Sequence, residues 1–156
     1  MVGPHARVER DFLGEREIPA GAYWGVHTAR ALENFPVSGT PISVHRPLVD
    51  ALGAVKQAAA RANHELGLID DRRAAAIDRA CQDVRDGLLD DQFVVDVIQG
   101  GAGTSTNMNV NEVVANRALL LLGLPAGTYD QVHPLDHVNR SQSTNDVYPS
   151  AVKLSL

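Results

Sequence analysis

The chain contains almost no cysteine, few aromatic residues and no long apolar run. Cys81 is the one cysteine among 156 residues, so no disulfide within the chain is possible, and a reducing compartment is the simplest interpretation. Aromatic residues make up 4%. Together with abundant alanine and leucine, this low content favours helices over an all-β fold. The longest apolar run, residues 118–122, is far shorter than the roughly 20 residues that a membrane span needs.

The chain is also short of basic residues. Lysine and arginine number 14 against 19 acidic residues, which leaves a net charge of -5 and no basic footprint typical of nucleic-acid binding. Residues 1–5 do not start a basic segment followed by an apolar core, so we expect no signal peptide. The hydrophobic content of 44% is ordinary for a soluble globular protein. We therefore expect a cytoplasmic protein of about one domain, with no nucleic-acid or membrane partner.

Glycine and proline recur through residues 7–40, which predicts an irregular region there. A helix is predicted from about Ser43 to Leu66, because apolar residues recur at spacings of three and four. Pro47 suits the first turn of this helix, and Gly67 suits its end.

A second helix is predicted after Asp70, whose side chain can cap it. Cys81 falls on its apolar face, so we interpret this thiol as part of the core. The face consists of Ile77, Ala80, Cys81, Val84 and Leu88. Residues 93–98 fit either a short buried strand or a turn of helix, because periodicity cannot decide for so short a run.

A third helix is predicted from about Ser105 to Leu122, after the glycine-rich residues 100–106. The backbone N–H groups that open this helix could bind a small anion such as a carboxylate. Alternatively, Ser105 or Thr106 simply caps the helix. The helix also carries polar residues that need partners, either in a polar interface or in a site. These residues are Asn107, Asn109, Asn111, Glu112 and Asn116.

A second polar cluster covers residues 133–146. His133, Asp136 and His137 are a weak metal-binding pattern, and a triad of Ser143 with His133 and Asp136 lacks a nucleophile-elbow motif. The glycine-rich loop is neither a dinucleotide fingerprint nor a P-loop. We expect the sequence to end within an element such as a helix. Unless that element finds a partner, it should expose its apolar residues, which are Ala151, Val152, Leu154 and Leu156.

The two polar clusters together resemble the two signature regions of the fumarase/aspartase family. The first is Gly100 to Asn109 followed by Asn111-Glu112-Val113, and the second is His133-Pro134 through Ser141 to Asp146. The stretch 22–35 is similar to that family as well, so the resemblance covers nearly the whole chain. It implies a mainly α fold, with a small N-terminal helical domain at residues 1–140. Residues 141–156 would then begin the central helical bundle, which is truncated in this sequence.

Within the family, Ala102 and Thr144 match the aspartase branch better than the fumarase branch. The resemblance therefore implies an ammonia-lyase that converts L-aspartate reversibly to fumarate through an aci-carboxylate intermediate. Two alternatives stay open. One is a fragment of a fumarate hydratase, and the other is a non-catalytic module for dicarboxylate binding or assembly.

The resemblance also implies roles for four residues. Thr104, Ser143 and Thr144 match the family's donors to the β-carboxylate of the substrate, and Asn145 matches a residue near the leaving group. No segment of the sequence matches the mobile loop that carries the family's catalytic base, so no catalytic residue is assigned and the chain alone is expected to be inactive. No metal or cofactor is implied, and complete members are homotetramers.

One residue departs from the family pattern. The family usually has asparagine after His-Pro, and this sequence has Leu135. We therefore assign no peripheral anion site comparable to that of fumarases here.

Overall fold

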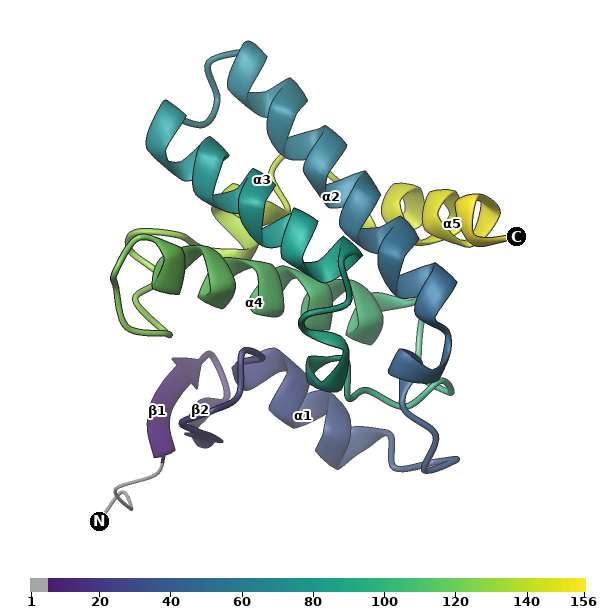
Figure 1. The fold of residues 1–156 in the computed structure, drawn as a ribbon. Coiled ribbons are helices and arrows are strands. Elements are labelled where there is room, and N and C mark those ends of the chain that lie inside the picture. Colours follow the sequence, from purple (N-terminus) through teal and green to yellow (C-terminus); the bar gives the residue numbers. More distant parts are fainter. Residues whose placement is uncertain (1–5) are drawn as a thin grey trace.

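A computed structural model describes residues 6–156, which form a mainly helical fold with one two-stranded sheet (Figure 1). The N-terminal part is more regular than predicted. β1 (Ala6–Asp11) and β2 (Gly14–Pro19) form an antiparallel hairpin, and α1 (Val26–Asn34) follows it. The prediction of an irregular region was wrong because contacts distant in sequence stabilise these elements.

Arg7 and Glu9 of β1 illustrate this stabilisation. The Arg7 guanidinium donates to the carbonyl oxygens of Ala22 and Trp24, both at 2.7 Å. The Glu9 carboxylate accepts the Val26 N–H at 2.9 Å. Charged residues of β1 thus bind the backbone that leads into α1. The strand lacks the alternation of apolar and polar residues by which a sequence pattern would predict it.

α2 (Arg46–Glu65) and α3 (Asp71–Arg85) pack side by side as a helical hairpin (Figure 1). The predicted ends are confirmed: Pro47 lies in the first turn of α2, and Gly67 follows it with φ of 70°. The Asp70 side chain accepts the Arg73 N–H and caps α3. The apolar face of α3 is buried with Cys81 in the core, but Leu88 lies beyond the end of α3 and is 62% exposed.

α4 (Thr104–Leu121) lies between the α2–α3 hairpin on one side and α1 with the β-hairpin on the other (Figure 1). Its central position explains why most of its side chains are buried, polar ones included. Before it, a short 3₁₀ turn at Asp90–Gln92 leads into residues 93–98, which form neither a strand nor a helix. They contribute the buried side chains of Phe93 and Val95 and a single bridge from Asp96 to Pro41.

After α4 the chain makes a π-helical turn at Pro134–Val138 and ends in α5 (Thr144–Ser155), which confirms a helix at this position. α5 packs against α2, so Ala151 is fully buried and Val152 is half-buried. The element thus has a partner in α2, which buries Ala151, whereas Leu154 and Leu156 are still 67% and 101% exposed. None of the helices in residues 6–156 is long and apolar enough to cross a membrane.

Candidate active site

The glycine-rich loop opens α4 without a side-chain cap. Gly103 occupies the N-cap position in the left-handed conformation, with φ of 83°. The capping hypothesis for Ser105 or Thr106 was therefore wrong. Gln99 takes part of that role, because its Oε1 accepts the Thr106 N–H at 2.8 Å and its Nε2 donates to Thr106 Oγ1 at 2.7 Å. Thr104, the first helical residue, is exposed.

The second polar cluster opens α5 in a similar way, with a capping box. Ser143 is the N-cap, and its Oγ accepts the Asn145 N–H at 3.2 Å. Asp146 completes the box by accepting the Ser143 N–H at 3.3 Å. Ser143 and Asn145 are exposed and Thr144 is half-buried, so the four candidate residues lie at the solvent-facing starts of two helices.

Two contacts bring these helix starts together. Asn107 Nδ2, on the first turn of α4, donates to Thr144 Oγ1 at 3.2 Å across 37 residues of sequence. The Tyr148 ring of α5 lies against Gly103, so closely that a Cβ there would meet the ring at 2.3 Å. The glycine therefore serves both the left-handed backbone and the close approach of α5. The fold thus combines the two clusters into one surface of hydroxyl, amide and backbone N–H groups.

Three other polar residues of α4, Asn109, Glu112 and Asn116, bind backbone groups of neighbouring segments rather than add to this surface. Asn109 binds the backbone at Gln92 and Val94, and Asn116 binds the Tyr23 carbonyl and the Gly127 N–H. The interface hypothesis therefore holds for these two asparagines. Glu112 accepts three backbone N–H groups at the start of α1, at distances of 2.8–3.0 Å.

Sequence reasoning missed the residues behind the site. The turn at residues 139–142 leads into α5, and the buried Lys56 ammonium of α2 donates to two of its side chains, Asn139 Oδ1 at 2.8 Å and Gln142 Oε1 at 3.0 Å. Burial lowers the pKa of Lys56 to about 7. The only sequence signal was a lysine among the apolar residues of a predicted helix.

The two histidines of the second cluster bind backbone groups. His133 Nδ1 accepts the N–H groups of Leu135 and Asp136, and His137 Nδ1 accepts the His133 N–H at 2.8 Å. Burial lowers the pKa of His137. Ser143 Oγ is engaged with its own helix rather than with a triad. Within residues 6–156, no group of three or more histidine, cysteine or acidic side chains could hold a metal ion.

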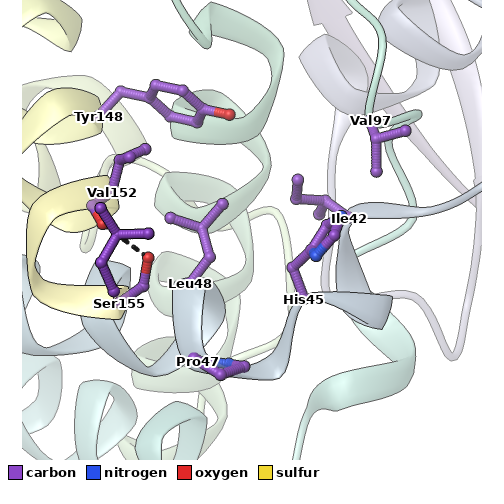
Figure 2. A pocket seen from close by; sticks show the side chains of 9 residues that line it. Ile42, His45, Pro47, Leu48, Val97, Tyr148, Val152 and Ser155 are labelled. Atoms are coloured by element: carbon purple, nitrogen blue, oxygen red, sulfur yellow. Dashed lines mark hydrogen bonds between the residues drawn. The ribbon is translucent and has the colours of Figure 1, made fainter.

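A separate cavity of about 360 Å³ lies between the start of α2, Val97 and α5 (Figure 2). Its walls are mainly apolar, including Ile42, Leu48 and Val152. His45, Tyr148 and Ser155 are its polar lining residues, and none of the four candidate site residues lines it.

Comparisons with known proteins identify the family of the chain. A family described as lyase matches residues 14–156. Aspartate ammonia-lyases from a Bacillus species and from Pseudomonas aeruginosa are 53% and 54% identical over 96% and 97% of this chain. A class II fumarate hydratase from Halobacterium salinarum is 58% identical over 96% of it. The chain spans about a third of the length of these relatives, between 31% and 32%.

Solved structures show the same fold. A crystal structure described as fumarate lyase:delta crystallin from Brucella melitensis is 58% identical, with a TM-score of 0.94 over 96% of this chain and 34% of that one. A class II fumarase from Schistosoma mansoni is 41% identical, with a TM-score of 0.88 over 96% of this chain and 31% of that one. The mainly helical fold predicted from the sequence is therefore confirmed.

Proposed function

This chain belongs to the lyase family, as the N-terminal portion of the fumarase/aspartase fold, and from that membership we propose that it carries part of the active site of an aspartate ammonia-lyase. The proposed reaction is the reversible deamination of L-aspartate to fumarate through an aci-carboxylate intermediate. The observation that carries the proposal is the meeting of two helix starts, rich in hydroxyl and amide groups, at the Asn107–Thr144 contact.

The chemistry of these groups suits a dicarboxylate. Thr104, Ser143 and Thr144 would donate to the β-carboxylate of the substrate, and Asn145 would lie near the leaving amine. The two helix N-termini add favourable dipoles for negative charge. Donors placed in advance stabilise the aci-carboxylate more than the substrate, because negative charge accumulates on that carboxylate as the proton leaves.

The same four residues cannot perform the proton transfer. Hydroxyl and amide side chains do not titrate near neutral pH, so a different group must remove the proton. The chain corresponds to about a third of its relatives, and we assign the base to the part of such a protein that this sequence does not include. The 156-residue chain alone is then inactive.

The assembly and location follow the same proposal. We place residues 1–140 in the N-terminal lyase domain and residues 141–156 at the start of the central helical domain. The complete protein would be a cytoplasmic homotetramer acting on a small dicarboxylate, without a membrane or nucleic-acid partner. Analytical ultracentrifugation of the protein as its host produces it tests the assembly, and a monomer at micromolar concentration would contradict it.

The function is tested by a matched pair of substitutions in that same host-produced protein. Thr104→Val removes the hydroxyl at nearly constant volume, and Thr104→Ser keeps it. Loss of one donor to a developing oxyanion typically costs about 10²-fold or more, so kcat/KM for L-aspartate should fall by about that factor in the valine variant only. Ammonia release provides the measurement. Equal kcat/KM values in both variants would show that the Thr104 hydroxyl does not bind the substrate. No ammonia release by the wild type would refute the proposed reaction.

A fumarate hydratase is the second candidate, favoured by the 58% identity to the Halobacterium enzyme. Both reactions share the aci-carboxylate and differ in the leaving group. Comparison of L-malate with L-aspartate as substrate therefore separates them: faster fumarate formation from L-malate would replace the first proposal with the second.

A further inference from the structure

Lys56 is the largest fully buried side chain of the fold, with an exposed fraction of 0%. Within residues 6–156, no carboxylate lies within ion-pair distance of its ammonium. A buried charge without a countercharge is costly, and an apolar side chain of similar length would avoid that cost. What such a side chain would lack is the set of N–H donors that Lys56 directs to Asn139 and Gln142.

Both acceptors lie in the turn of residues 139–142, where Gln142 Nε2 also donates to the carbonyl oxygens of Val138 and Arg140 at 2.9 Å and 3.1 Å. Ser141 has φ of 59°, in the left-handed region that costs a non-glycine residue roughly 1 kcal/mol or more. Asn63 of α2 donates to the Arg140 carbonyl at 2.9 Å, and Asn139 Nδ2 donates to the Gln142 carbonyl at 3.1 Å. Side chains from α2 therefore hold the turn in this conformation.

The network continues from the turn to the candidate site. Asn139 Oδ1 accepts a second hydrogen bond, from Asn107 Nδ2 at 3.2 Å. Asn107 Nδ2 also donates to Thr144 Oγ1. An ammonium only donates, so it holds the amide oxygen of Asn139 towards itself and the Nδ2 towards the turn. Lys56, Asn139, Asn107 and Thr144 thus form one continuous path from α2 to the first residue of α5.

We propose that Lys56 is a positioning residue for the candidate active site. Through Asn139 and Gln142 it holds the 139–142 turn, and so keeps Ser143 and Thr144 beside the first turn of α4. The catalytic consequence rests on the proposed function, whereas the positioning of α5 rests on the contacts alone.

The network also responds to pH. Burial lowers the pKa of Lys56 to about 7, and the groups facing it are the Cys81 thiol of α3, Asn107 of α4 and the amides of the turn. A neutral amine donates more weakly than an ammonium. The hold on the start of α5 should therefore weaken as pH rises through about 7.

The experiment uses the protein as its host produces it and compares the two lysines of this sequence, the buried Lys56 and the exposed Lys153. Amide hydrogen exchange is measured at Asp146 and Val147, whose N–H groups both donate to the Ser143 carbonyl at 3.0 Å. Loss of about one hydrogen bond's net contribution predicts roughly tenfold faster exchange there in Lys56→Met, with a smaller change at Ile77 in α3.

Lys153→Met is the matched control and should leave these exchange rates unchanged. If Lys56→Met does not fold, Gln142→Leu removes one acceptor of Lys56 together with the Gln142 Nε2 bonds to the Val138 and Arg140 carbonyl oxygens, and it should accelerate exchange locally at Asp146 and Val147. Equally faster amide hydrogen exchange across α3 and α5 in both variants would show that Lys56 stabilises the fold as a whole, which would overturn the proposal. Native exchange at Asp146 and Val147 in Lys56→Met would overturn it as well.

Kinetics of the protein as its host produces it complete the test. Lys56→Met should raise KM for L-aspartate and lower kcat, and the wild-type kcat/KM profile should carry an inflection near pH 7 that the variant lacks. If the wild type turns over no dicarboxylate, the proposed function fails while the exchange data still decide the positioning role.

Discussion

Glu112 joins α4 to the start of α1, and its replacement by glutamine should destabilise the fold strongly. The carboxylate is fully buried. Its Oε2 accepts the N–H groups of Gly25 and Thr28 at 2.8 Å and 3.0 Å, and its Oε1 accepts that of His27 at 2.8 Å. Gly25 has no side chain to cap α1, so Glu112 supplies the cap from a helix more than 80 residues away.

The magnitude follows from the geometry. In Glu112→Gln one of the two oxygens becomes an NH₂ group, which faces at least one N–H donor in either orientation. One hydrogen bond to a charged acceptor is lost, worth about 1.5–3 kcal/mol, and a buried donor is left unsatisfied at about 1–3 kcal/mol. The lower desolvation cost of a neutral amide offsets part of this sum. We therefore expect a loss of about 3 kcal/mol, which lowers Tm by roughly 6–12 °C for a chain of this size.

Urea unfolding followed by the fluorescence of Trp24, the single tryptophan and the neighbour of Gly25, measures the effect. Glu65→Gln makes the same chemical change at an exposed residue of α2 and should stay within about 0.5 kcal/mol of wild type. A Glu112→Gln variant as stable as Glu65→Gln would refute the reasoning, because it would mean that the three N–H groups find other acceptors.

Three further outcomes are expected. Gly103→Ala should lower the free energy of unfolding by at least about 2 kcal/mol in urea, because the new Cβ would lie 2.3 Å from the Tyr148 ring. Gly127→Ala is the control, with a similar φ of 87° and no contact closer than 3.6 Å, and should cost only about 1–2 kcal/mol of backbone strain. Equal costs in the two variants would contradict the close contact. Four hydrogen bonds from Ile98, Ser38 and Gly39 lower the pKa of Asp96 to about 2, so its contribution to stability is complete above about pH 4 and is lost as pH falls through 2. In an acid titration, Asp96→Asn should therefore lose less stability than the wild type over this range, and parallel stability curves would contradict this. Burial raises the pKa of Cys81 to about 12, so alkylation should follow global unfolding, and modification of the native protein within minutes would contradict its burial.

Local patterns in the sequence were enough for much of the helical framework. The spacing of apolar residues predicted α2, α3 and α4, and Gly67 and Asp70 marked helix ends, because periodicity and end signals act within a few residues. Cys81 was correctly predicted in the core for the same reason. The two polar clusters were also sufficient to indicate the family.

The tertiary structure decided what depends on contacts between distant segments. The β-hairpin was missed because its strands carry charged residues whose partners lie beyond β2, such as the carbonyl oxygens that Arg7 binds. Leu88 was predicted to be buried and is exposed, and the burial of Ala151 depends on the packing of α5 against α2, since burial depends on which helix packs alongside rather than on the residue's own type. Gln99 and Lys56 belong to no local motif, and their roles follow from hydrogen bonds that only the folded chain brings within 3 Å. The candidate site is likewise a tertiary product, because the starts of α4 and α5 are joined by side chains 37 residues apart that no sequence spacing could connect.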